Sequence, residues 1–515
     1  MFLAIFVVRT WHWPLVGDAA LMHYVVFLMD HGFAPYRDII DPNMPGTYFI
    51  QGAVIHLLGG SALAWRIFDL LLLAASGLAM VVIALPYDWF AGVFAATLFA
   101  LIHGRDGLID VGQRDLMMTV WLVFGYMLLF QAMRSESEGQ RSWRMALFGF
   151  CVGAASTIKP TASLFAVALL LLAAVTLRKR QRPFVLPIGS AVVGFALPCA
   201  LALLFLQRWH ATAAFTDTLN SLVPALTVLD RRSFPHLLWH SISSTMLPLF
   251  FLWLPVAYAR RNSRSFERSA LFLGVVLGLL SFYIQRKGYP YHRYPSEVFL
   301  LLLIGTDFTT ALTNNDWKSL AIPRRFAAAG LLVGVLIVGG GSLVHALGQD
   351  WRNQEFDSML QKDLAGLGGD TLSGQVQCLD SADGCIPTLY NMRLVQDTGF
   401  MYDCYLLSPD LNSTTEQSYR ERFWAEIQKK PPQVFIVSSN ECTPGGGLYS
   451  YSKLDRWPLL RDYLNRNYRV AADRIPPHLV NWGSSPSKPM GYRVYVKKGP
   501  SAEDALEKTS AAEAP

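Results

Sequence analysis

The chain has 515 residues, of which 52% are hydrophobic and only 16% are charged. Soluble domains carry about 25% charged residues, so this composition excludes an ordinary soluble protein. The net charge of +6 does not indicate a nucleic-acid partner, because the positive residues gather in short loops between apolar runs, which is a signal of membrane topology.

The N-terminal region combines a short apolar segment with a polar loop. The apolar run from Phe2 to Val8 is shorter than the ~20 residues that cross a bilayer, so we expect either a true start further upstream or a partial first helix. The loop that follows, residues 17–46, holds Asp18, Asp30, Asp38 and Asp41. Its apolar part predicts amphipathic helices that lie at the membrane surface, not a further span.

Longer apolar runs then recur along the chain. They cover residues 62–84, 89–104, 116–133, 145–157, 161–177, 184–206, 241–259, 269–285, 296–313 and 326–346. With the first short helix, they predict about eleven transmembrane helices.

The loops between these runs fall into a basic set and a second set. The basic set covers residues 134–144, 178–182, 260–268 and 314–325. Excess Lys and Arg in short loops marks the cytoplasmic side, so these loops and the N-terminus are predicted to be cytoplasmic. Because residues 145–177 have basic loops at both ends, they must cross the membrane twice. Pro160 breaks the helix there, so we expect a hairpin with its turn at Lys159.

The composition changes to that of a soluble domain near residue 346. We therefore predict a membrane domain over residues 1–346 and a C-terminal domain over residues 347–515. Residues 431–439 and 492–498 are typical of strands, and residues 419–430 and 454–468 of helices. The domain contains Cys378, Cys385, Cys404 and Cys442, and an even cysteine count in an exported domain predicts disulfides. Proximity along the chain favours Cys378–Cys385 and Cys404–Cys442.

The second set of loops, predicted to face outward, holds most of the polar chemistry. Its candidate site residues are Asp18, Asp38, Asp41, Asn43, Arg105, Asp106, Asp110, Arg114, Asp115, Lys159, Lys287, Tyr291, His292 and Arg293. Carboxylates can act as general bases, and cations can stabilise a departing phosphate. Each residue also has a structural explanation, such as a helix N-terminus for Asp115 or snorkelling for Lys159.

At these residues the chain resembles the GT-C glycosyltransferases. More narrowly, it resembles the bacterial branch related to protein O-mannosyltransferases and aminoarabinose lipid A transferases. That family has an acidic residue in a long first external loop, where GDAALMHY supplies Asp18. A G-x-x-P-Y-x-D step follows, where GFAPYRD supplies Asp38, and Asn43 stands where a Lys is common.

The later motifs of the family occur in the same order. GQRDLMMTVW supplies Asp115 at the start of a helix, and STIKPTA supplies Lys159 at a turn. KGYPYHRYP supplies Lys287, Tyr291 and His292. The resemblance covers about residues 1–346, and a small external α/β domain is also common in the family.

The resemblance implies an all-α GT-C membrane fold with an added extracytoplasmic α/β domain. It implies a glycosyltransferase in a bacterial inner membrane that moves a hexosyl or pentosyl group from a polyprenyl-phosphate donor. The lipid would lie in a groove open to the bilayer, and the acceptor would be a glycan, lipid or protein. Asp18 would be the general base of an inverting transfer. Donor phosphate and sugar would contact Lys159, Lys287, Tyr291, His292, Arg293, Arg114, Asp115, Asp38, Asp41 and Asn43.

Three further expectations remain open at this point. A divalent cation, Mg²⁺ or Mn²⁺, is compatible with Asp18 and Asp115, although no ligand spacing demands it. Residues 207–240 are predicted to form a mobile loop over the groove. The alternatives to a transferase are a flippase for lipid-linked sugars, which would place Lys159 inside one long helix, and a non-catalytic envelope assembly protein.

Overall fold

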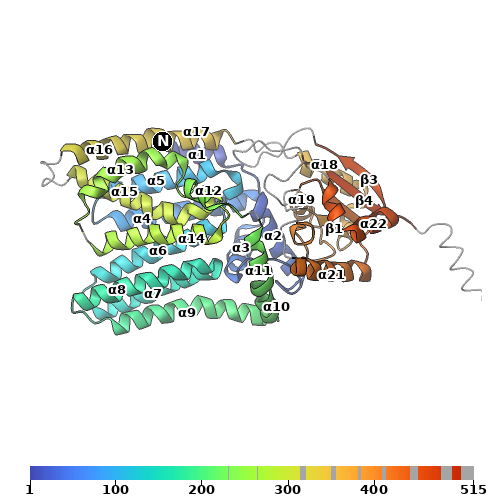
Figure 1. Ribbon diagram of the computed structural model, residues 1–515, viewed down its shortest axis with the longest axis horizontal. Helices are drawn as coiled ribbons and strands as arrows, with labels where there is room; N and C mark the ends of the chain where they lie inside the picture. The colour runs from blue at the N-terminus through green and yellow to red at the C-terminus, as the bar shows by residue number, and fades with distance from the viewer. Residues whose placement is uncertain are drawn as a thin grey trace, which may run out of the picture.

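The computed structural model describes residues 1–229, 231–263, 265–313, 321–349, 355–380, 384–408, 413–440, 451–476 and 490–499. Long helices run roughly parallel in one bundle, and a small sheet with its own helices lies beyond one end of that bundle (Figure 1). Shorter helices fill the space between these two parts. The chain therefore has a helical membrane body and a C-terminal α/β domain. The predicted boundary at residue 346 stays a prediction, although the last bundle helix ends at Leu347.

The helices of the bundle coincide with the predicted spans. They are α4 (Ala62–Ala84), α5 (Trp89–Asp106), α6 (Arg114–Arg134), α7 (Glu138–Ile158), α8 (Ser163–Lys179), α9 (Val185–Arg208), α13 (Leu247–Ala259), α14 (Phe266–Gln285), α15 (Tyr294–Thr313), α16 (Ala321–Val333) and α17 (Gly340–Leu347). Among the described residues, seven helical segments are long and apolar enough to cross a membrane. The protein is thus a multi-pass membrane protein, while the count of about eleven helices stays a prediction.

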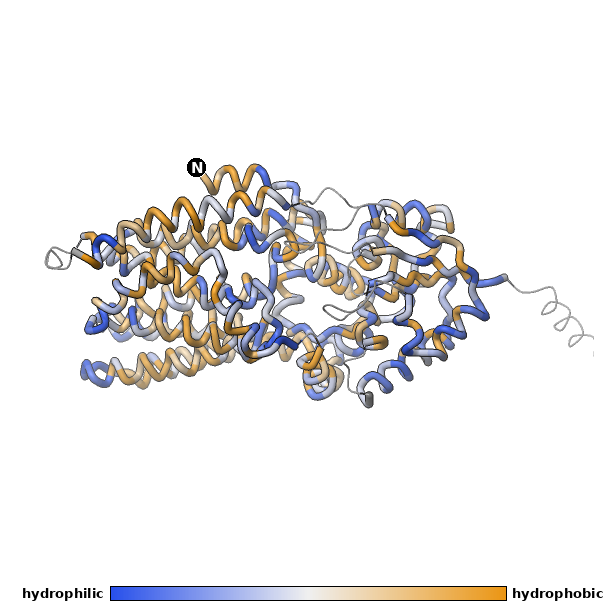
Figure 2. Tube along the Cα trace, turned by 45° about the horizontal axis from the view of Figure 1, so that its top comes forward, coloured by the Kyte–Doolittle hydropathy of each residue, from blue (hydrophilic) through white to orange (hydrophobic). Residues whose placement is uncertain are grey.

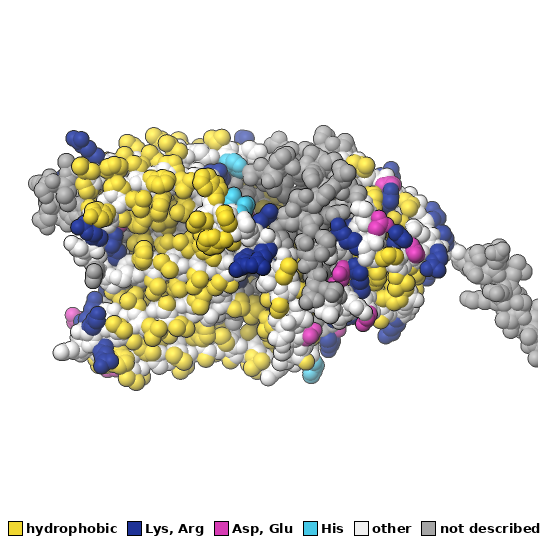
Figure 3. Space-filling model, viewed as in Figure 1, with side chains coloured by type: hydrophobic (Ala, Val, Ile, Leu, Met, Phe, Trp, Pro, Cys, Tyr) yellow, Lys and Arg dark blue, Asp and Glu magenta, His cyan; other side chains and the backbone are white. Residues whose placement is uncertain are grey.

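The outer surface of the bundle is apolar, as a lipid-facing surface requires. Hydrophobic residues run along its helices (Figure 2), and hydrophobic side chains cover the face of the bundle seen in Figure 3. Lys and Arg side chains gather at the end away from the C-terminal domain.

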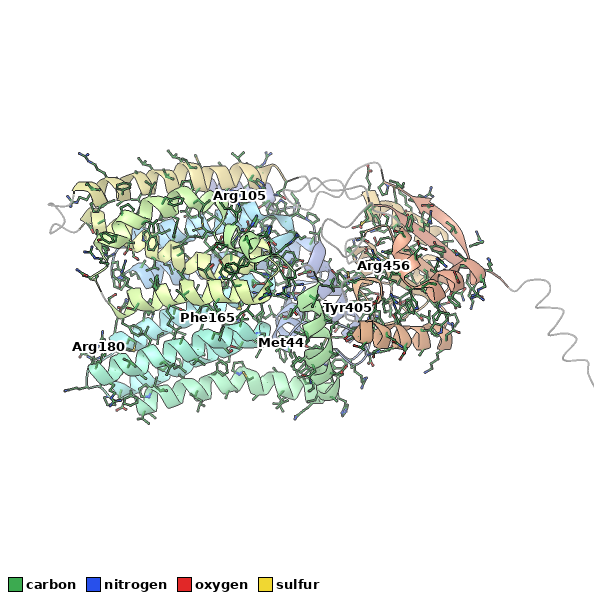
Figure 4. All side chains as sticks on the ribbon, in the orientation of Figure 1. Met44, Arg105, Phe165, Arg180, Tyr405 and Arg456 are labelled. Carbon is green, nitrogen blue, oxygen red and sulfur yellow. A yellow bond between two sulfur atoms is a disulfide. The ribbon has the colours of Figure 1, made fainter. Side chains whose placement is uncertain are left out.

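The predicted hairpin is present between α7 and α8. The turn runs from Lys159 through a short 3₁₀ helix, Pro160–Ala162. Arg180 lies at the opposite end of the bundle (Figure 4), where it donates to the carbonyl of Met133. The basic loops therefore share one end of the bundle. Lys159 lies at a turn, whereas a position in the middle of one long helix would favour the flippase alternative.

Glycines bring α7 and α9 into close contact. A Cβ atom on Gly149 would lie 1.9 Å from the Ala191 carbonyl oxygen, and one on Gly194 would lie 2.0 Å from that of Ala146. In a bilayer, helices associate by such close packing of small residues, because lipid supplies no hydrophobic drive between them. This contact fixes α9 beside α7.

The first external loop contains two helices at the end of the bundle. They are α2 (Gly17–Asp30) and α3 (Pro45–Leu58), and the partial first helix is α1 (Phe2–Thr10). The apolar residues Phe49 and Leu57 of α3 are 42% and 82% exposed, which suits a helix at the lipid surface. The apolar residues of α2 are instead buried, because α2 packs against the C-terminal domain.

Residues 207–240 are mostly helical, which differs from the predicted loop. They form α10 (Thr212–Asp217), a π-helix (Thr218–Leu222), α11 (Val223–Val228) and α12 (Phe234–Trp239). Leu222 belongs to an apolar cluster shared with the C-terminal domain. Packing against the C-terminal domain stabilises the helices here, and a contact between such distant parts of the chain cannot be predicted from the local sequence.

The C-terminal domain is a four-stranded sheet with helices. Its strands are β1 (Val376–Leu379), β2 (Val434–Ser438), β3 (Tyr468–Arg474) and β4 (Tyr492–Lys497), and its helices are α18 (Glu355–Gly366), α19 (Cys385–Asn391), α20 (Cys404–Leu407), α21 (Ser413–Lys429) and α22 (Pro458–Asn467). The strand order is β1-β2-β4-β3. β1 runs parallel to β2, with Val376 opposite Val434, whereas β4 runs antiparallel to both β2 and β3. Every residue of β2 is buried, which explains its continuous apolar sequence.

One predicted disulfide is confirmed. Cys378, in β1, is bonded to Cys385 at the start of α19. Cys404 is also disulfide-bonded, but its predicted partner, Cys442, lies outside the described residues. The C-terminal domain thus contains disulfide-bonded cysteines, which are typical of domains in oxidising compartments.

Backbone contacts join the C-terminal domain to the first external loop. The Tyr24 hydroxyl of α2 donates to the Leu394 carbonyl at 2.9 Å and accepts from the Gln396 amide at 2.8 Å. The Ile40 amide donates to the Gly399 carbonyl at 3.1 Å. The two parts therefore pack as one unit around α2.

Gly399 tests this junction. A Cβ at Gly399 would lie 1.6 Å from the Asp38 carbonyl oxygen, so we expect Gly399→Ala to force the parts apart at a cost of about 1–3 kcal/mol. The measurement is limited proteolysis of the C-terminal domain together with the melting temperature in detergent. The control is Gly366→Ala, because no atom lies within 4 Å of that Cβ. Equal protease resistance of both variants would contradict the predicted junction.

Candidate active site

Asp18 and Arg114 form an ion pair at the end of the bundle next to the C-terminal domain. Asp18 lies in the first turn of α2, where the helix dipole favours a carboxylate. Arg114, the first residue of α6, donates from Nη2 to Asp18 Oδ2 at 2.7 Å, and Gln113 Nε2 donates to the same oxygen at 3.4 Å. The Asp18 side chain is 39% exposed, so a ligand can reach it.

A second ion pair, between Lys159 and Asp115, is more buried than the pair of Asp18 and Arg114. Lys159 Nζ is 2.6 Å from Asp115 Oδ2 and donates to Gln285 Oε1 at 2.7 Å. The same Nζ lies 5.9 Å from the centre of the Tyr291 ring. Asp115 is fully buried, whereas the Lys159 side chain keeps 15% exposure. The hairpin turn, α6 and α14 thus hold one cation in a largely buried position.

The loop between α5 and α6 is anchored to α4, and it positions both ion pairs. Asp69 Oδ1 accepts from the Gly112 amide at 2.7 Å, and the Trp65 indole donates to the Val111 carbonyl at 3.0 Å. Asp69 also pairs with Arg66, as the sequence predicts, and both side chains are buried. Gly112 has a φ of +63°, and a Cβ there would lie 2.5 Å from Trp65, so only glycine suits this turn.

The late motif KGYPYHRYP folds beside these pairs. Arg293 contacts Asp106 Oδ1 at 3.4 Å and Glu297 Oε1 at 3.2 Å. His292 is buried. Lys287 donates to the carbonyl of Leu226 in α11 at 2.6 Å, so it holds the helical segment of residues 207–240. Of the predicted phosphate contacts, Lys159 is therefore the cation that pairs with Asp115, whereas Arg293 pairs with Asp106 and Glu297.

Asp41 and Asn43 form a buried group in the first external loop. Asn43 Nδ2 donates to Asp41 Oδ1 at 2.7 Å, and the Tyr48 hydroxyl donates to Asp41 Oδ2 at 2.6 Å. Burial raises the pKa of Asp41 above its ordinary value, although these hydrogen bonds and Arg114 oppose that shift. Asn43 thus orients Asp41 through a neutral amide, whereas a Lys at this position would bring a positive charge.

Two acidic residues of this loop lie apart from the ion pairs. Asp38 pairs with its neighbour Arg37 at 2.8 Å, on the side where Arg422 of the C-terminal domain donates to the Arg37 carbonyl. Asp38 therefore lies at the domain junction, and its predicted substrate contact stays a prediction. Asp30 is exposed and pairs with His56 at 3.1 Å.

An apolar groove opens beside the second ion pair. It has a volume of about 470 Å³ and is lined by Gly46, Phe49, Ile50, Trp121, Ala154, Thr157, Ile158, Pro198, Leu201, Leu204, Phe205 and Arg208, from α3, α6, α7 and α9. Ile158 immediately precedes Lys159 in the chain. Because Leu201 and Leu204 are 49% and 58% exposed on α9, the groove communicates with the lipid-facing surface.

The structure buries Asp110, one of the candidate residues from the sequence, and it adds polar residues that the sequence did not single out. Asp110 is buried, and among the described residues neither of its carboxylate oxygens has a hydrogen-bond partner. Burial, followed by the charge of Asp106, raises its pKa well above the ordinary value. Gln113, Gln285 and Glu297 also contact site residues. Gln285 ends one apolar run and Glu297 begins another, whereas Gln113 stands in a polar loop directly before Arg114 and Asp115.

The expected divalent cation stays a prediction. Within the ranges that the structure describes, no group of three or more His, Cys, Asp or Glu side chains could hold a metal ion. Asp18 and Asp115 are each paired with a cation of the protein, so they do not form a ready metal site.

The same architecture occurs in solved membrane glycosyltransferases. ArnT from Cupriavidus metallidurans in the apo state is similar with a TM-score of 0.57 and 12% identity, over 96% of each chain. The Archaeoglobus fulgidus oligosaccharyltransferase tethered with an acceptor peptide has a TM-score of 0.51 and 11% identity, over 84% of this chain and 68% of that chain. The arabinofuranosyltransferase AftD from Mycobacteria has a TM-score of 0.52 and 12% identity, over 96% and 41%.

No family model matches the chain, and no curated protein matches it in sequence. The structural likeness shows the fold: the chain has the GT-C fold seen in integral-membrane glycosyltransferases. Within that class its architecture is ArnT-like, because the likeness extends through both the membrane body and the C-terminal domain. The resemblance expected from the sequence motifs is confirmed at the level of fold.

Proposed function

We propose that this protein transfers a sugar from a polyprenyl-phosphate-linked donor to an extracytoplasmic acceptor. The observation that supports this function best is the combination of an accessible carboxylate, Asp18, with a largely buried ammonium, Lys159, next to a lipid-facing apolar groove. An isoprenoid chain suits the groove, and a phosphate suits the cation. ArnT has been solved with undecaprenyl phosphate, and the archaeal transferase AglB with dolichol-phosphate.

The proposed reaction is a single displacement. Asp18 accepts the proton of an acceptor hydroxyl, and the hydroxyl oxygen forms a bond to the anomeric carbon. The bond between that carbon and the phosphate oxygen breaks, and the electron pair leaves with the polyprenyl phosphate. Attack from the side opposite to the phosphate inverts the anomeric configuration. Lys159 and Arg114 stabilise the charge that develops on the phosphate.

The orientation belongs to the same proposal. The basic loops lie at the end of the bundle away from the C-terminal domain. Under the positive-inside rule that end faces the cytoplasm of a bacterial inner membrane. Asp18, Lys159 and the disulfide-bonded C-terminal domain then face outward, where a lipid-linked sugar meets its acceptor.

The proposed function is tested with membranes that contain or lack the protein. A strain without the gene is expected to accumulate an intact lipid-linked sugar, which identifies the donor. Membranes with the protein are expected to release undecaprenyl phosphate from that extracted lipid and to incorporate its sugar into an acceptor. Movement of the intact lipid across vesicles without cleavage would instead identify a flippase, and no change in either assay would support an assembly protein.

A further inference from the structure

A second groove lies at the basic end of the bundle, away from the candidate active site. It has a volume of about 900 Å³ and is lined by Glu138 and Ala146 of α7 and by residues in the stretch 181–193. That stretch begins directly after Arg180, which Figure 4 shows at the end of the bundle away from the C-terminal domain. The groove beside Lys159 is lined by the opposite halves of α7 and α9, so the two grooves are separate.

One wall of this second groove is apolar and open. Val185, Leu186 and Val193 of α9 line it and are 75%, 58% and 72% exposed. Gly189 also lines it, and a Cβ atom there would meet no other atom within 4 Å. On a helix that spans a membrane, exposed apolar side chains contact lipid chains. The wall formed by α9 therefore suits an acyl chain.

Two guanidinium groups lie at the polar part of the same groove. Arg182 lines it. Arg141 of α7 lies directly behind the lining, because its Nη1 donates to the Pro183 carbonyl at 3.4 Å. Arg141 Nη2 and Arg182 Nη1 donate to one common acceptor, the Ser135 carbonyl, at 2.8 Å and 3.1 Å. Two positive charges thus converge on a single neutral oxygen.

The described residues supply no carboxylate partner to these two groups. Arg141 and Arg182 bond there to backbone carbonyls and form no ion pair, not even with Glu138, the one acidic residue of the lining. Arg141 is only 1% exposed, and its Nε is a buried donor that lacks a hydrogen-bond partner within the described ranges. Burying a charge is costly unless an opposite charge is close to it. An anion from outside the chain would supply that charge, and the planar guanidinium fork matches a phosphate.

We propose that this second groove binds an anionic phospholipid. Its phosphate pairs with Arg182 and lies close to the charge of Arg141, and an acyl chain lies along the exposed apolar residues of α9. Basic pockets between membrane helices recognise anionic head groups in this way. A free phosphate ion would leave the apolar wall unused, and a zwitterionic lipid would bring its own cation beside the two guanidinium groups. The inference is independent of the proposed transferase function.

The test titrates the full-length protein in detergent with phosphatidylglycerol and follows the melting temperature, from which an apparent Kd is obtained. Phosphatidylglycerol is expected to raise the melting temperature more than phosphatidylcholine does. Arg182→Gln is expected to weaken the apparent Kd for phosphatidylglycerol about fivefold, the contribution of one cation at a membrane surface. Gly189→Leu fills the groove without removing a charge and is expected to weaken it at least as much. Leu is a better helix former than Gly, so this variant keeps the fold.

Each variant has a matched control. Arg178→Gln removes an exposed cation from the same end of the bundle, and Gly341→Leu adds the same side chain to α17, where a Cβ atom also meets nothing within 4 Å. Both controls are expected to keep the wild-type Kd. The proposal is overturned if Arg182→Gln and Gly189→Leu bind phosphatidylglycerol like the wild type. It is also overturned if phosphatidylcholine or inorganic phosphate alone raises the melting temperature of the wild type as much as phosphatidylglycerol does.

Discussion

Asp18→Asn is expected to lower the rate of undecaprenyl phosphate release by about 10²–10⁴-fold, the usual contribution of a general base. Asn keeps the size of the side chain and can still accept a hydrogen bond from Arg114, which lies 2.7 Å from Asp18. KM for the donor is therefore expected to change little, because the substitution removes the group that accepts the proton of the acceptor hydroxyl and leaves the binding of the lipid unchanged. Steady-state release from the extracted donor lipid measures both parameters.

Asp30→Asn is the control for this result. Asp30 lies in the same helix as Asp18 but is exposed and pairs with His56. The same chemical change at Asp30 is expected to leave release at the wild-type rate. A folded Asp18→Asn protein that turned over normally would remove Asp18 as the base and, with it, the proposed reaction.

Lys159→Met is expected to destabilise the protein by about 3–5 kcal/mol, because it leaves a buried carboxylate without its partner. Asp115 is fully buried, and Lys159 lies 2.6 Å from it. The double variant Lys159→Met, Asp115→Leu removes both charges and is expected to recover most of the stability. It is not expected to recover activity, because the cation that faces the donor phosphate is still absent. Melting temperature in detergent and undecaprenyl phosphate release separate the two effects.

Arg178→Gln is the control for loss of a cation. Arg178 is an exposed residue in the last turn of α8, whose C-terminal end lies at the basic end of the bundle. Its replacement is expected to change neither stability nor release. Activity in the double variant would show that Lys159 acts only as a structural partner of Asp115. A single variant that melted like the wild type would refute the buried pair.

The membrane body could be predicted from sequence because its physical signal is local. A bilayer demands a continuous apolar run with an internally hydrogen-bonded backbone, and the long helices of the bundle carry such runs. The turn at Lys159 followed from Pro160 together with the charges of the flanking loops. The strands β2 and β4 were predicted for a similar reason, since β2 is almost entirely apolar and β4 is rich in Val and Tyr. The Cys378–Cys385 disulfide followed from a short separation along the chain.

Other elements could not be predicted, because their stability comes from distant contacts. Residues 207–240 were expected to form a loop but are mostly helical, because residues such as Leu222 pack against the C-terminal domain. β1 has only four residues, and β3 carries mostly exposed residues, so neither gives a recognisable strand pattern in the sequence. α2 has the sequence of a helix for a membrane surface, yet protein covers its apolar residues.

The site divides in the same way. The sequence by itself determined which end of the bundle carries Asp18, Asp115, Lys159 and His292, because motif order and loop charge are properties of the chain. Only the tertiary structure decided the partners, which are Arg114 for Asp18 and Lys159 for Asp115. The physical reason is that a helix span and its orientation follow from the transfer of local segments into lipid. Ion pairs and domain contacts instead join residues far apart in the chain, whose distances depend on how the whole protein packs.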